Sequence, residues 1–98
     1  MNTLRQRTTI TRRSTPALPR HVRIQFDPVR QAWAVLSPEK VFWPNEVSLD
    51  ILRRCDGETT VATMVTALAA EYGAPEEDIE PDVVTFLQEW TDKLLVRS

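Results

Sequence analysis

The chain has 98 residues, 42% of them apolar, and a formal net charge of −2, which is enough for one small domain and not for two. Its single cysteine and single histidine exclude an internal disulfide and a Cys/His metal cluster. No apolar run approaches the roughly 20 residues that a membrane-spanning helix needs. The composition therefore predicts a soluble, cytoplasmic protein with no membrane partner, no metal and no cofactor.

The charge is unevenly distributed along the chain. Residues 1–20 hold five arginines and no acidic residue, whereas residues 21–98 hold seven basic and all fourteen acidic residues. An acidic body repels a polyanion, so the charge argues against nucleic acid as a partner. We predict a basic, solvated tail over residues 1–20 and a folded domain over residues 21–98. Docking of the tail on the acidic body is the alternative.

Three short segments are predicted to form strands. Apolar residues alternate with polar ones over 21–27, which is typical of a half-buried strand, and the pattern resumes over 31–36 after a turn. Residues 41–43 form a short third strand that Pro44 ends. The segments predict an antiparallel meander whose third strand is an edge, with free backbone N–H and C=O groups.

Two helices are predicted to follow the strands. Asn45 is expected to cap a helix over 46–56, and Gly57 to end it by adopting a positive φ. Thr60 is expected to cap a second helix over 61–72, in which apolar residues recur at helical spacing along one buried stripe.

A third helix is predicted to begin near Asp78, so that Pro81 falls within its first turn, where no intrahelical N–H is lost. Apolar residues line one face of this helix as far as Leu94. The order of three strands and three helices predicts an α+β fold with the helices stacked on one face of the sheet. A winged-helix-like arrangement is one concrete version.

No catalytic constellation is apparent in the sequence. A serine or cysteine nucleophile needs a base beside it, and the only histidine, His21, opens a strand next to prolines. Cys55 is expected on the buried side of the first helix, and the acidic cluster over 76–82 fits a helix N-terminus better than a calcium loop. We therefore expect no enzyme activity. An edge strand beside a helix with a wide apolar arc suggests a protein that binds an extended peptide by strand addition.

Several motifs occur in the order and spacing of a known family. They are His21-Val22-Arg23-Ile24, the strand with Trp33, Ser37-Pro38-Glu39-Lys40-Val41, Ile51-Leu52 followed by Cys55-Asp56-Gly57, Thr60-Val61, and Asp82-Val83-Val84 with Phe86-Leu87. With these motifs, roughly residues 20–97 resemble the PqqD family of pyrroloquinoline quinone (PQQ) biosynthesis.

The resemblance implies a function and a site. PqqD-like proteins are peptide chaperones that bind the precursor peptide PqqA and present it to the radical SAM enzyme PqqE, and their fold is called the RiPP recognition element. In that family the precursor docks as an added strand on the third strand, in a groove that the third helix also lines. The resemblance thus implies a peptide-binding site formed by Lys40, Val41, Phe42, Trp43, Val83, Val84, Leu87, Trp90 and Thr91.

Two alternatives stay open at this point. A winged-helix DNA-binding regulator could use the third helix for recognition, although Lys93 is the only basic residue between Val83 and Leu95. The sequence also leaves both a monomer and a homodimer open. One departure from the family pattern is Lys40, which stands where the family often has arginine and lacks the planar guanidinium.

Overall fold

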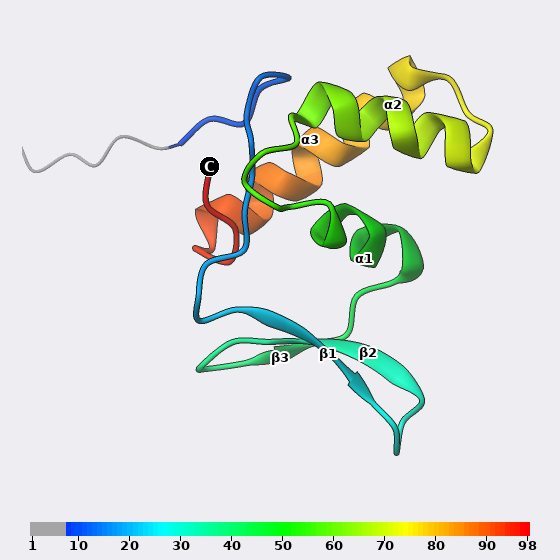
Figure 1. The fold of residues 1–98 in the computed structure, drawn as a ribbon. Coiled ribbons are helices and arrows are strands. Elements are labelled where there is room, and N and C mark those ends of the chain that lie inside the picture. The colour runs from blue at the N-terminus through cyan, green and yellow to red at the C-terminus, as the bar shows by residue number, and fades with distance from the viewer. Residues whose placement is uncertain (1–7) are drawn as a thin grey trace, which may run out of the picture.

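The computed structural model of the protein describes residues 8–98. It contains three strands, β1 (Arg23–Asp27), β2 (Ala32–Leu36) and β3 (Val41–Phe42), followed by three helices, α1 (Glu46–Arg53), α2 (Val61–Tyr72) and α3 (Glu76–Asp92). The helices gather on one side of the small sheet (Figure 1). The predicted α+β architecture is confirmed.

The sheet is an antiparallel meander in the order β1-β2-β3. Ile24 and Phe42 are the partners of Val35 on its two sides, and Val35 is fully buried. Because side chains alternate along a strand, residues paired with Val35 share its face, which is covered by the helices. The outer face carries the intervening residues, Gln25, Ala34, Leu36 and Val41.

The predicted helix caps are present. The Asn45 side chain accepts a hydrogen bond from the Ser48 N–H at 2.8 Å, and the Thr60 hydroxyl oxygen accepts one from the Thr63 N–H at 3.1 Å. Gly73 ends α2 in the left-handed conformation, with φ +64°. These caps depend on local chemistry alone, which explains why the sequence predicts them.

The first helix is shorter than predicted, because α1 ends at Arg53 and not at Asp56. Asp56 forms an isolated β-bridge with Ala17, which draws the backbone away from the helix. Gly57 adopts the expected positive φ, +79°, and its N–H donates to the Pro16 carbonyl at 2.9 Å. Residues 56 and 57, just after the helix, therefore pair with the N-terminal segment.

The third helix starts earlier than predicted, at Glu76, with Pro75 as its N-cap. Pro81 consequently lies inside the helix and not in its first turn, which corrects the prediction. Proline lacks an N–H, so the carbonyl of Glu77 loses its usual helical partner. Glu77 is exposed, and water can satisfy that carbonyl.

Residues 8–19 form what we call the N-terminal strap, which packs against the helices and the C-terminal segment. The strap runs along the helices and returns beside the C-terminal segment before entering the sheet (Figure 1). Ala17 and Arg97 exchange two backbone hydrogen bonds, of 2.7 and 2.8 Å. The carbonyls of Arg12 and Ser14 accept from the N–H groups of Ala62 and Val61 at 3.0 and 2.9 Å.

Those two contacts satisfy N–H groups in the first turn of α2 that have no partner within the helix. Ile10 is buried, and Arg12 forms an ion pair with Glu80 on α3. In the structure the strap thus contacts α2, α3 and the C-terminal segment, which is the arrangement that the docking alternative describes. Residues 1–7 of the predicted tail lie outside the described residues.

The core lies between the helices and the inner face of the sheet. It includes the α2 stripe predicted from helical spacing: Val61, Met64, Val65, Leu68 and Ala69. Within residues 8–98, none of the helices combines the length and the apolar character required to cross a bilayer.

Candidate functional site

Strand β3 is one edge of the sheet, paired with β2 on one side only. The turn before it is fixed by Ser37, whose N–H and hydroxyl both donate to the Lys40 carbonyl, at 3.0 and 2.8 Å. This turn holds β3 in register with β2. The other side of β3 offers backbone N–H and C=O groups to a further strand.

An aromatic cluster joins β3 to α3. The ring of Trp90 lies 5.2 Å from Phe42 and 5.1 Å from Phe86, measured between centroids. The Lys40 ammonium lies 5.2 Å from the centroid of the Phe42 ring. Phe42 and Phe86 are only half-buried, so the cluster presents aromatic surface beside the free edge of β3.

The structure separates the α3 residues that the family resemblance implies. Trp90 contacts β3 through the ring of Phe42. Val83, Leu87 and Thr91 are buried, and Leu87 has no exposed surface. Val84 is half-buried and lines a hollow with Ile10 and Gln88, on the flank of α3 that the strap covers.

Phe86 belongs with Phe42 and Trp90, although it is not among the site residues that the family resemblance implies. Helical spacing places it on the third helix but does not reveal which flank of that helix meets the third strand. The alternation of β3 could have helped, because it predicts that Phe42 points toward the helices.

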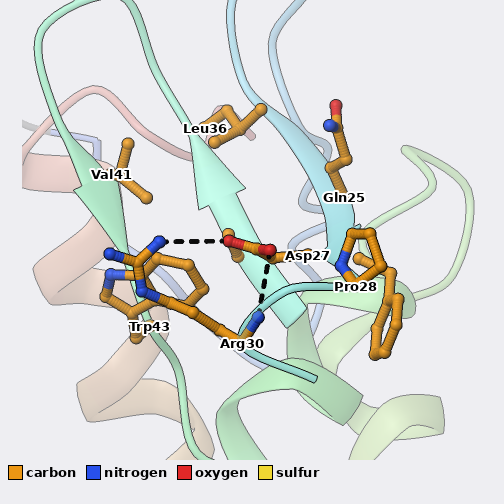
Figure 2. A pocket seen from close by; sticks show the side chains of 9 residues that line it. Gln25, Asp27, Pro28, Arg30, Leu36, Val41 and Trp43 are labelled. Atoms are coloured by element: carbon orange, nitrogen blue, oxygen red, sulfur yellow. Dashed lines mark hydrogen bonds and ion pairs between the residues drawn. The ribbon is translucent and has the colours of Figure 1, made fainter. Parts of the chain in front are cut away.

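Alternation also divides the four predicted β3 residues between two faces. Phe42 points toward α3, whereas Val41 points to the outer face. There Val41 and Trp43 line a hollow together with residues of β1, β2 and the β1–β2 turn (Figure 2). The four residues therefore do not form one surface.

Asp56 and Gly57 are structural residues of the turn between α1 and α2. The Asp56 carboxylate accepts from the N–H groups of Glu58 and Thr59, at 2.9 and 2.7 Å, and from the Thr59 hydroxyl at 2.9 Å. The Thr59 and Glu58 N–H donors lower the pKa of Asp56 below its ordinary value of 3.8. The carboxylate is thus committed to holding the turn.

Cys55 is buried, and its thiol donates to the Ile51 carbonyl at 3.3 Å. Burial, followed by the charge of Asp56, raises the pKa of Cys55 to about 12. A thiol of this kind stays protonated and is not a nucleophile at neutral pH. Among residues 8–98, His, Cys, Asp and Glu form no group of three or more that could hold a metal ion.

Comparison with known proteins gives a consistent family. Residues 32–96 match the model of coenzyme PQQ synthesis protein D (PqqD). A PqqA binding protein of Rhodopseudomonas palustris strain TIE-1 is 44% identical over 88 residues, which cover 90% of this chain and 86% of that protein.

Two solved structures extend the comparison to the fold. The PqqD truncation of Methylobacterium extorquens PqqCD, described as a functional, stand-alone RiPP recognition element, has a TM-score of 0.78 and 31% identity over 93% of this chain and 97% of its own. PqqD from Xanthomonas campestris has a TM-score of 0.58 and 38% identity over 92% of this chain and 100% of its own. The chain belongs to the PqqD family.

Proposed function

We propose that this protein binds the precursor peptide PqqA during PQQ biosynthesis and presents it to the radical SAM enzyme PqqE, without catalysing a reaction itself. The name of the Rhodopseudomonas relative supports the identity of the peptide. The proposed binding surface is the free edge of β3 together with Phe42, Phe86 and Trp90.

The observation that carries the proposal is the position of this aromatic cluster beside an unpaired edge. An extended peptide added to β3 gains backbone hydrogen bonds from the edge and places alternate side chains against the cluster. Because β3 contains only two residues, the ladder is short, and side-chain contacts with the aromatic rings supply much of the affinity. Val83, Leu87 and Thr91 are buried, so they are not part of the proposed contact surface.

The DNA-binding alternative receives no support from α3. This helix holds seven acidic residues and no lysine or arginine. A recognition helix needs basic residues to approach phosphates, and α3 would repel them. Peptide binding is therefore the better explanation for the exposed aromatic surface beside β3.

Calorimetric titration with a synthetic PqqA precursor peptide tests the proposal. Phe86→Ser is expected to weaken binding by about tenfold or more, because it removes one half-buried aromatic ring from the proposed binding surface. Tyr72→Ser is the matched control, since Tyr72 is also a partly exposed aromatic residue but lies at the end of α2. Its affinity should match that of the unaltered protein.

Circular dichroism of each variant establishes that the fold is retained. If Phe86→Ser bound the peptide as tightly as the unaltered protein does, the aromatic cluster would not be part of the binding surface. A companion assay measures PqqE turnover of PqqA with either variant present. Stimulation by Tyr72→Ser and not by Phe86→Ser is the expected result for presentation to PqqE.

A further inference from the structure

The hydrogen-bonding phase of β3 determines how an added strand would pair. Val35 pairs with Phe42, Leu36 pairs with Val41, and the Ser37 N–H donates to the Lys40 carbonyl at 3.0 Å. Backbone groups alternate in direction along an antiparallel ladder, so those of Lys40 and Phe42 face β2. The N–H and C=O of Val41 therefore face away from the sheet, toward the position of an added strand.

The direction of these backbone groups determines on which face of the sheet each side chain of a bound peptide lies. A peptide residue that exchanges hydrogen bonds with Val41 places its side chain on the same face as Val41, which is the outer face. The residues before and after it point to the opposite face, toward Phe42 and α3. The aromatic cluster of Phe42, Phe86 and Trp90 can thus contact only alternate residues of the peptide.

The outer face holds a hollow of about 360 Å³ that reaches β3. Phe26 and Pro28 line its far side, and Ala34 and Leu36 on β2 line its floor. At the β3 side it is lined by Val41 and Trp43, which are 46% and 48% exposed. Figure 2 shows Trp43 beneath the guanidinium of Arg30, with Val41 and Leu36 above them in the view. Two large apolar side chains so exposed at one edge are the part of this hollow nearest to an added strand.

The two charged side chains that line the hollow, Arg30 and Asp27, form an ion pair with each other. Arg30 donates to the Asp27 carboxylate at 3.2 Å, and its guanidinium carbon lies 5.1 Å from the centroid of the Trp43 ring. The Asp27 carboxylate also accepts from the N–H groups of Val29 and Arg30, at 2.9 and 3.2 Å. The hollow therefore has no unbalanced charge that calls for a charged ligand, and its exposed part is apolar.

We propose that the outer-face hollow receives an apolar side chain of the bound peptide, from the residue that pairs with Val41. A long aliphatic or aromatic side chain there can reach across Val41 and Trp43, since diagonal neighbours on a sheet lie within reach of such side chains. The inference rests on the proposed function. It adds that the peptide is recognised on both faces of β3, with a period of two residues.

Double-mutant cycles between protein and peptide test this inference. Each residue of a synthetic PqqA peptide is replaced by alanine, and every peptide is titrated against the unaltered protein, Trp43→Ala and Phe86→Ala. Trp33→Ala is the control, because Trp33 is 40% exposed and also lies under a guanidinium, that of Arg53, but on the inner face. Val41→Thr makes the edge polar while it keeps the β-branched shape that suits a strand.

We expect adjacent peptide positions to couple energetically to different residues of the protein. At one apolar position, alanine weakens binding about tenfold in the unaltered protein but less than twofold in Trp43→Ala and Val41→Thr. The adjacent positions couple in the same way to Phe86→Ala, and none couples to Trp33→Ala. Coupling of every sensitive position to Phe86 and of none to Trp43 or Val41 would overturn the inference and leave the proposed function intact. Affinity that neither Phe86→Ala nor Trp43→Ala changes would overturn both.

Discussion

At the scale of single residues, the clearest assignment is that of Asp56. It follows a buried cysteine and precedes the glycine with φ +79°, a position at which a reactive carboxylate would be conspicuous. Its hydrogen bonds to Glu58 and Thr59 account for it instead. These donors stabilise the charged form in the folded state, so the contribution of Asp56 to stability depends on pH.

The pKa of Asp56 is lowered by folding from its ordinary value of 3.8. Its contribution is therefore fully present above that value and is lost as the pH falls through the lower, folded value. We expect Asp56→Asn, which keeps an oxygen acceptor but no charge, to lower the urea midpoint at pH 6 and to have a smaller effect near pH 2. Urea unfolding at both pH values checks this. An equal effect at both values would show that the charge of Asp56 does not stabilise the turn.

At the scale of elements, the N-terminal strap behaves as part of the fold. It supplies carbonyls to the first turn of α2, a bridge to the C-terminal segment and the side chain of Ile10 to the core. The Ile10 N–H and the Thr8 carbonyl both contact the Gln88 side chain, at 2.9 Å each. The strap thus covers the flank of α3 that carries Val84 and leaves open the flank that carries Phe86.

Ile10→Ala tests whether the strap contributes to stability. Ile10 is 4% exposed, and truncation of a buried isoleucine typically costs about 2–5 kcal/mol of unfolding free energy. Val29→Ala is the control, since Val29 is 90% exposed and should change stability by no more than about 0.5 kcal/mol. Chemical denaturation measures both. A loss below about 0.5 kcal/mol for Ile10→Ala would mean that the strap is only loosely attached.

The elements also show which features a sequence can predict. Asn45, Thr60 and Gly73 act on backbone groups within four residues of themselves, so their roles follow from local chemistry. The position of the strap does not follow from local chemistry, because its partners from Asp56 onward lie 39 or more residues away and its own residues have no repeating apolar pattern. The sequence does not reveal the early end of α1 for the same reason, since Asp56 pairs there with the distant residue Ala17.

At the scale of the whole molecule, the family and the architecture are predictable from the sequence. The residues that form the proposed binding surface are predictable only in part. Three of the six motifs that resemble the PqqD family lie at turns and helix ends, and together the motifs establish the order of the elements. They do not establish how α3 is rotated about its axis. That rotation places Trp90 against Phe42, buries Leu87 and turns Val84 toward the strap.

The central claim is that a peptide pairs with the free edge of β3 through the backbone of Val41. Amide hydrogen exchange of the protein with and without a saturating PqqA peptide measures this directly. We predict that exchange of the Val41 N–H slows at least tenfold in the complex, because that group gains a hydrogen bond. The Phe42 N–H, which faces β2 already, should change much less. Saturated binding with unchanged exchange at Val41 would contradict strand addition at this edge.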